Sequence, residues 1–176
     1  MAKKILIALV VILIAIQFIR PAKNTSDEIS PTDIAYHYVI PDSVDLILKS
    51  ACNDCHTNNT AYPWYAELQP SAWFLNQHVT DGKRHLNFTT FTSRNIARQN
   101  HVLEEIIETV KEGEMPLPSY TWFGLHPKAN ISEAQRNTLI TWAQIQMDSL
   151  KANYPADSLI LRRPGNTSQG SPGEHH

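Results

Sequence analysis

The chain has 176 residues, 42% of them hydrophobic, which is enough for one domain with a core and short extensions. The formal net charge is −2 at pH 7, but residues 25–155 contain 15 acidic and 9 basic side chains, a formal charge of −6. A folded part of that sign lacks the basic face that nucleic acids require, so we expect no nucleic acid partner.

The first 23 residues have the layout of an export signal. Two lysines precede an apolar run from residue 5 to 19, and Arg20-Pro21 closes it. No small-residue cleavage site follows, so we expect an uncleaved signal-anchor over residues 1–23 rather than a cleaved signal peptide. As a helix the run rises about 22 Å, less than the ~30 Å hydrocarbon core, although flanking residues can snorkel. We therefore expect an N-terminal membrane helix in the inner membrane, a polar tether over residues 24–34, and a domain in the periplasm.

A helix is predicted to begin at Pro41-Asp42-Ser43, where an N-cap candidate precedes an acidic first turn. Val44, Ile47, Leu48 and Ala51 then recur at helical spacing and form one apolar stripe. The helix leads directly into the chain's only two cysteines.

Those cysteines lie in Cys52-Asn53-Asp54-Cys55-His56, which has the form C-x-x-C-H, the attachment signature for c-type haem. Two thiols three positions apart project from the same side of one turn and can add to the two vinyl groups of one porphyrin. The imidazole of His56 then lies beneath the ring, where it can bind iron as the proximal ligand. The motif predicts one covalent haem c, and its attachment requires a cytochrome c maturation machinery as a partner.

Three other interpretations of the cysteines stay open: a structural disulfide, a zinc half-site and a thiol redox pair. A closed zinc site needs a second Cys/His pair at short spacing, which the chain lacks. A thioredoxin-like pair lies near a strand–helix–strand pattern, which is also missing. The export signal favours haem independently, because bacteria attach haem outside the cytoplasm.

Further helices are predicted after the motif. One covers Ser71 to Val79 and is broken by Asp81-Gly82; another covers about Ile96 to Glu112. A last helix opens at a capping box, formed by Ser132 and Gln135.

No segment alternates as a strand would, so we expect an all-α domain over residues 35–154. From residue 155 onward the chain is rich in Pro, Gly, Ser and Asn, which predicts a disordered tail over residues 155–176.

The second axial position of the iron has one leading candidate, Met115. It lies in the stiff loop Glu114-Met115-Pro116-Leu117-Pro118, where its thioether can be aimed rather than packed in a helix. Met147 lies on a helical core stripe and is expected to pack there. His78 is the alternative distal ligand, and an open or water-bound position is the third possibility.

Several residues are candidates to surround the haem. Trp64, Tyr65 and Arg84, with Lys83 and Arg98, are expected to line the pocket or hold the propionates. A backbone carbonyl at Pro63 or a neighbour is expected to accept the Nδ1–H of His56.

The order of these motifs resembles that in class I cytochromes c, which implies a cytochrome c-like helical fold. The finer match is to the bacterial haem-binding domain family. The residues that carry it are the motif with its Asn-Asn-Thr-x-Tyr-Pro-Trp-Tyr continuation, Gly82 to Phe88, Glu104-Glu105-Ile106 and Gly113 to Leu117, within residues 35–151. The resemblance implies a small exported or membrane-tethered domain that binds haem through Cys52, Cys55 and His56.

These observations predict one-electron transfer with redox partner proteins, by a protein that is a carrier rather than an enzyme. The alternative is a haem-based sensor or a peroxidase-like enzyme with an open sixth position, and a third interpretation is a zinc or disulfide-stabilised domain. Binding of CO or peroxide separates the first two, and the third predicts no Soret band.

Overall fold

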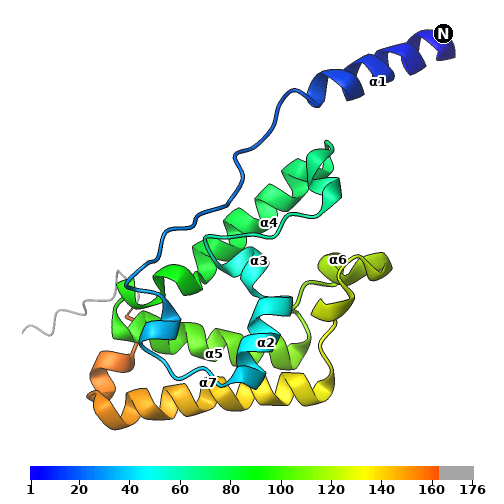
Figure 1. Ribbon diagram of the computed structural model, residues 1–176. Coiled ribbons are helices and arrows are strands. Elements are labelled where there is room, and N and C mark those ends of the chain that lie inside the picture. Colours follow the sequence, from blue (N-terminus) through cyan, green and yellow to red (C-terminus); the bar gives the residue numbers. More distant parts are fainter. Residues whose placement is uncertain (163–176) are drawn as a thin grey trace, which may run out of the picture.

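The computed structural model describes residues 1–162, apart from the side chain of Phe123, and within this part the chain is helical with no strand (Figure 1). The expected all-α class is therefore confirmed. The α-helices are α1 (Ala2–Ile16), α2 (Asp42–Ala51), α3 (Asn53–His56), α4 (Ser71–His85), α5 (Ile96–Glu112), α6 (Pro118–Thr121) and α7 (Glu133–Asn153). Short 3-10 helices join them: η1 (Ile34–Tyr36), η2 (Trp64–Glu67), η3 (Phe88–Ser93), η4 (Trp122–Gly124), η5 (Pro127–Ala129) and η6 (Ala156–Leu159).

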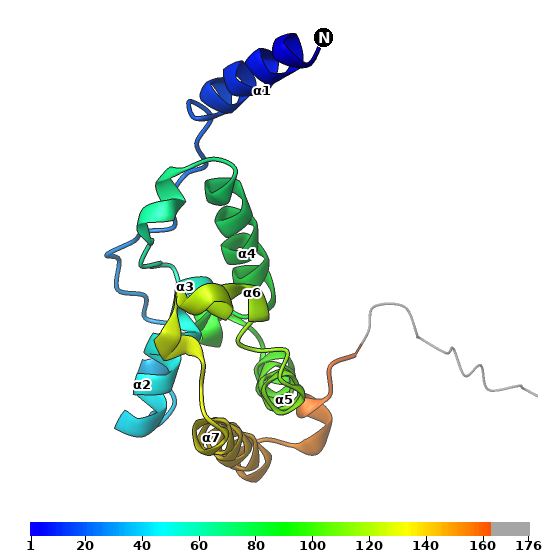
Figure 2. The ribbon, with the colours of Figure 1, turned by 90° about the vertical axis from the view of Figure 1, so that its right-hand side faces the viewer.

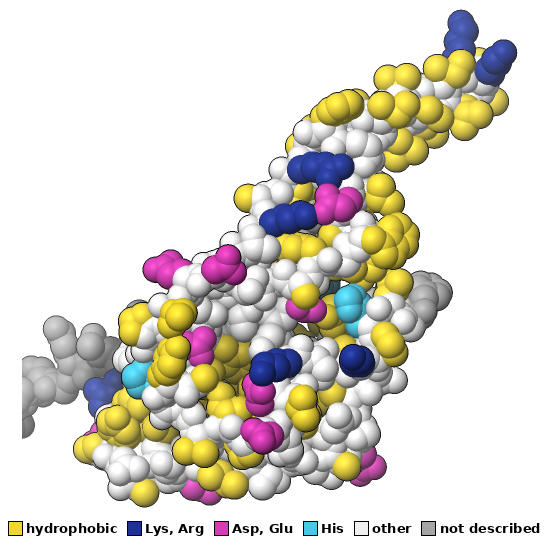
Figure 3. All heavy atoms as spheres, in the orientation of Figure 1, with side chains coloured by type: hydrophobic (Ala, Val, Ile, Leu, Met, Phe, Trp, Pro, Cys, Tyr) yellow, Lys and Arg dark blue, Asp and Glu magenta, His cyan; other side chains and the backbone are white. Residues whose placement is uncertain are grey.

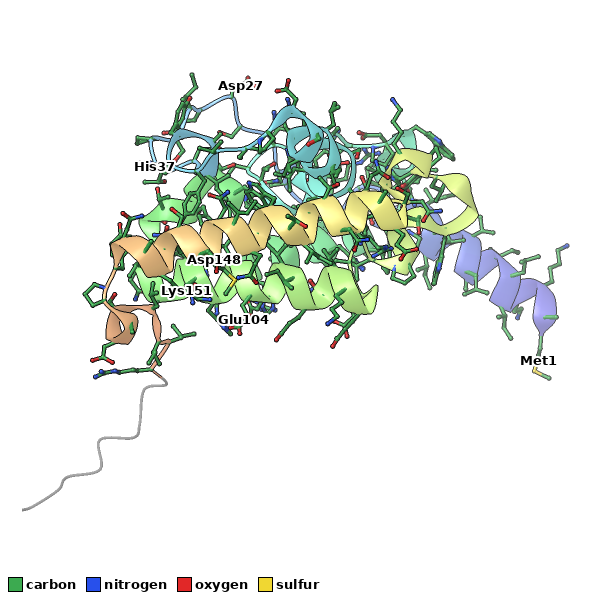
Figure 4. The ribbon with its side chains drawn as sticks, turned by 90° about the horizontal axis from the view of Figure 1, so that it is seen from below. Met1, Asp27, His37, Glu104, Asp148 and Lys151 are labelled. Atoms are coloured by element: carbon green, nitrogen blue, oxygen red, sulfur yellow. The ribbon has the colours of Figure 1, made fainter. Side chains whose placement is uncertain are left out.

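The antiparallel helices α5 and α7 form the base of the domain. Figure 4 shows them side by side, with Glu104 on α5 and Asp148 and Lys151 on α7. α5 has the predicted bounds, and α7 begins where the sequence predicts it. Asn95 caps α5 by accepting from the Arg98 amide, and Ser132 and Gln135 form the predicted capping box of α7.

The core lies between α2, α5 and α7. Its members are apolar residues at helical spacing, as the stripes of the three helices predict. Leu103 and Ala143 are fully buried, and the Trp142 indole Nε1 donates to the Val39 carbonyl at 2.9 Å, which fixes the segment before α2 against α7. The buried apolar residues of the three helices are Val44, Ile47, Leu48, Val102, Leu103, Ile106, Val110, Leu139, Trp142, Ala143, Met147 and Leu150.

The predicted end of α4 at Asp81-Gly82 is wrong, because the helix continues to His85. Gly82 serves a different purpose there. A Cβ atom at this position would lie 2.7 Å from the Cys55 carbonyl oxygen, so only glycine lets α4 approach the cysteine motif this closely.

The predicted disordered tail is wrong for its first residues. Ala156–Leu159 form η6, and Leu159 is buried against the core beside α5. The Asn100 side chain donates to the Leu159 carbonyl at 3.4 Å. The rest of the predicted tail, residues 163–176, lies outside the described residues.

The predicted apolar helix at the N-terminus is present as α1, which has no buried residue and projects from the helices of the domain (Figures 1 and 2). Among residues 1–162, no helix combines the length and apolar character needed to cross a membrane, so a spanning α1 is not supported. Asn24, where the polar tether was expected to begin, is hydrogen-bonded to the domain through Thr57, Thr60 and Tyr62.

Candidate haem site

A cavity of about 450 Å³ lies between the cysteine motif, the end of α4, and α5. Cys52, Cys55 and His56 line it, and so does Met115, about sixty residues later in the chain. The fold therefore brings the predicted attachment residues and the leading distal candidate to one site. The remaining walls are mainly apolar: Leu48, Ala51, Leu86, Phe88, Val102, Ile106, Val110, Leu117 and Leu139 contribute to them.

The cysteine motif is a single helical turn. α2 ends at Ala51, and the Cys52 carbonyl then accepts from the amides of Cys55 and His56 at 3.1 and 3.0 Å. Both thiols are free. Burial raises the pKa of Cys52 to about 12 and that of Cys55 to about 11, so both are protonated at neutral pH in the polypeptide without haem.

The His56 ring is held by two backbone carbonyls. Its Nδ1 lies 3.1 Å from the Gly82 oxygen and 3.0 Å from the Leu86 oxygen. Carbonyls only accept, so Nδ1 carries the proton and Nε2 keeps its lone pair, as a metal-binding imidazole requires. The expected acceptor at Pro63 is wrong, because the end of α4 supplies both carbonyls. Burial lowers the pKa of His56 and outweighs these two bonds.

The loop that carries Met115 is fixed at both sides. Gly113 ends α5 with a left-handed φ of 77°, and the amides of Glu114 and Met115 both donate to the Thr109 carbonyl. From α7, the Arg136 guanidinium donates to the Met115 and Val110 carbonyls at 3.1 and 3.0 Å. The sequence pointed to Met115 through its prolines, but it held no local signal for Arg136.

The zinc interpretation loses its support. Within the described part of the chain, no group of three or more His, Cys, Asp and Glu side chains is arranged to hold a metal ion. A closed zinc site needs four such ligands, whereas an apolar cavity with two thiols and one oriented imidazole suits a porphyrin.

The sequence matches the family model described as haem-binding domain over residues 11–145. The chain belongs to the haem-binding domain family. Haem is accordingly its cofactor, and the lining of the cavity fits that group: apolar walls for the ring and an imidazole whose Nε2 is free to bind iron. Neither the search of curated proteins nor the search of solved structures gave a match.

In this haem-binding domain, the alternative distal candidate His78 lies on α4. The two carbonyls that hold His56 come from Gly82 on the same helix and from Leu86 directly after it. His78 lines the haem cavity and is half-buried, and its Nδ1 lies 2.8 Å from the Phe74 carbonyl of the preceding turn. Met115 lines the same cavity from the loop after α5, and not from the helix whose end holds the His56 imidazole.

Three expected pocket residues lie elsewhere. Trp64 and Tyr65 line a second cavity of about 380 Å³, which shares Cys55 and His78 with the first. The Arg84 side chain is 69% exposed and pairs with Asp81 on its own helix, because it projects from the outer face of α4. It lines neither cavity.

The other two basic candidates for the propionates also have different partners. Lys83 donates to the Asn24 side chain, and Arg98 lies 3.7 Å from Glu105 and donates to the His85 carbonyl. Neither lines the haem cavity.

The second cavity contains a polar cluster that the sequence did not reveal. The Tyr120 hydroxyl donates to the Asp54 carboxylate inside the cysteine motif, and the Tyr65 hydroxyl lies 2.6 Å from Nε2 of His126. The rings of Tyr120 and His126 stack with centroids 4.0 Å apart. The cluster ties α6 and the residue before η5, His126, to the motif and to η2. Its members are too far apart in sequence for any spacing pattern to link them.

Proposed function

We propose that this haem-binding domain carries single electrons, with one haem bound covalently through Cys52 and Cys55 and with His56 and Met115 as the axial ligands. The observation that carries the proposal is that these four side chains line one cavity. When bound, the haem supplies one-electron cycling between Fe(II) and Fe(III), and a thioether ligand raises its potential.

The residues around the cavity would support this role. The carbonyls of Gly82 and Leu86 hold His56 in the tautomer that leaves Nε2 available. The hydrogen bonds of Thr109 and Arg136 hold the Met115 backbone in place, and mainly apolar walls surround the site. A fixed ligand set of this kind suits electron transfer, in which the coordination changes little between the two oxidation states.

We further propose that the protein is exported and anchored to the inner membrane by α1, so that the domain meets its redox partner proteins in the periplasm. Support comes from the two lysines that precede the apolar run and from α1 itself, which has no buried residue. The helix has 15 residues, so anchoring would require snorkelling or local thinning at its ends.

Haem staining of a denaturing gel tests the attachment. The full chain is expressed in cells with a cytochrome c maturation system, beside a Cys52→Ala/Cys55→Ala control. A band that survives denaturation and is missing in the control is the expected result. The absence of a haem-stained band in cells that have the maturation system would refute the proposal.

Addition of CO to the reduced protein then tests the ligand set. A spectrum unchanged by CO indicates two protein ligands and supports electron transfer. Ready CO or peroxide binding would favour the sensor or peroxidase-like function instead.

A further inference from the structure

The domain has an exposed apolar surface at the end nearest α1. Four side chains from η2, the residue after it and the start of α4 define it, and we refer to it as the aromatic surface. Trp64 is 75% exposed, and Phe74 is 52% exposed. Leu68 and Trp73 complete the surface. An exposed cluster of large apolar side chains on a small domain indicates contact with another apolar phase or molecule.

The aromatic surface adjoins the second cavity. Trp64 and Phe74 line that cavity, and so do Trp122 and Leu125, which are themselves exposed. Exposed large apolar side chains therefore contribute to the lining of the second cavity.

Specific hydrogen bonds fix the end of α1 beside this surface. The Gln17 side chain donates to the Gln69 carbonyl at 3.2 Å and accepts from the Gln69 amide at 3.0 Å. The buried Gln69 side chain in turn donates to the Ile19 carbonyl at 2.7 Å. Gln69 directly follows Leu68 of the aromatic surface, so α1 and the surface are held at the same end of the molecule.

Two ion pairs strengthen the same joint. Arg20 and Lys23 both contact Glu67, which precedes Leu68. Figure 1 shows α1 leaving the domain at the end where α4 begins, and Figure 3 shows hydrophobic side chains over α1 and on the adjoining end of the domain. A membrane that receives α1 would therefore meet this end of the domain first.

We infer that the aromatic surface lies in the interfacial layer of the membrane in which α1 is anchored. The inference rests on the proposed anchoring and adds a second point of contact to it. Trp is enriched at membrane interfaces because its ring has an apolar body and one polar N–H. Two exposed Trp side chains, Phe74 and Leu68 beside an exposed apolar helix match that chemistry. The contact orients the domain so that the start of α4 faces the membrane. The haem cavity then lies at the other end of α4.

Photo-cross-linking to lipid tests this inference on the full-length, haem-loaded protein. The photoreactive residue benzoylphenylalanine replaces Trp64 or Trp73 in turn, and the protein is reconstituted in vesicles of phosphatidylethanolamine and phosphatidylglycerol. Leu46 is the matched control, because it is exposed on α2, the helix that packs on α7 away from α1 (Figure 1). Ile12 in α1 reports on anchoring. Lipid adducts are read by mass spectrometry after irradiation.

Lipid adducts at positions 64 and 73 about tenfold above those at position 46 are the expected result. Adducts at position 12 without adducts at 64 and 73 overturn the inference and leave anchoring intact. No adducts at position 12 would refute anchoring by α1 itself. Cross-links from 64 or 73 to a polypeptide would identify a protein interface and also overturn the inference.

Discussion

The backbone oxygen of Gly82 accepts a hydrogen bond from Nδ1 of His56 at 3.1 Å, at a point where α4 approaches the cysteine motif too closely for any side chain. One residue thus provides both the close approach and the orientation of the imidazole. Because the obstacle to a Cβ atom is the Cys55 backbone, it cannot be relieved by rotating a side chain.

Gly82→Ala is therefore expected to push α4 away from the motif and weaken both carbonyl contacts to His56. Overpacking of this kind costs about 1–3 kcal/mol, measured as the free energy of unfolding in denaturant. Thr80→Ala, an exposed position on the same helix, is the control and should change stability by less than about 0.5 kcal/mol. Equal stability of the two variants would show that α4 does not pack on the motif in this way.

Met115→Ala is expected to leave the haem attached and to open the sixth position. The reduced variant should bind CO and lose the spectrum of a thioether ligand, because no other side chain is proposed to bind the iron on that face. Met147→Ala is the matched control. Met147 is buried on α7, so its loss should lower stability by about 2–5 kcal/mol without changing the spectrum. An unchanged spectrum for Met115→Ala would shift the assignment to His78.

Arg136→Gln is expected to loosen the Met115 loop without touching the iron. The guanidinium donates to two carbonyls at the end of α5 and in the loop, and a glutamine side chain is too short to reach both. We expect a lower reduction potential and partial CO binding, intermediate between the wild type and Met115→Ala. Arg136→Lys should restore part of the potential. A loss of stability with no change in potential would indicate a role in folding alone.

His126 is expected to make stability depend on pH. Burial lowers its pKa, against the attraction of Asp54, and its neutral Nε2 lies in hydrogen-bond distance of the Tyr65 hydroxyl. The unfolded state then binds the proton more readily, so this contribution is present above the ordinary pKa of about 6.5 and is lost as the pH falls through the lower, folded value.

The measurement is the free energy of unfolding of the wild type and of His126→Asn between about pH 7 and pH 5. The wild type should lose more stability across this interval than the variant, which keeps a polar side chain but does not titrate. Parallel curves would contradict the assignment.

Signals confined to a few neighbouring residues predicted their elements well. The capping box at Ser132 located the start of α7, the helical spacing over residues 96–112 located α5, and C-x-x-C-H located the helical turn that lines the cavity. Features that depend on distant partners were not predictable. Gly82 looked like a helix breaker because its contact with Cys55 is not visible in the local sequence.

The same dependence on distant contacts explains the other differences between the sequence predictions and the structure. The composition of the tail obscured one short apolar segment, in which Leu159 contributes to the core. Arg84 and Tyr65 were chosen by residue type near the motif, but the direction of a side chain on its helix decides whether it reaches the cavity. Arg136, which donates to the Met115 carbonyl of the proposed ligand loop, belongs to no sequence pattern.

The side chains proposed to hold the haem come from two separate parts of the chain. Cys52, Cys55 and His56 all precede residue 57, whereas Met115 and Leu139 also line the cavity, with Arg136 bonded to the Met115 carbonyl. With the proposed attachment through the two thiols, a gel stain reports only on the first third of the polypeptide, and a chain that ends before α7 should still retain haem after denaturation. Colour alone would thus be a poor measure of correct folding in this protein, and the state of the iron would be the better one.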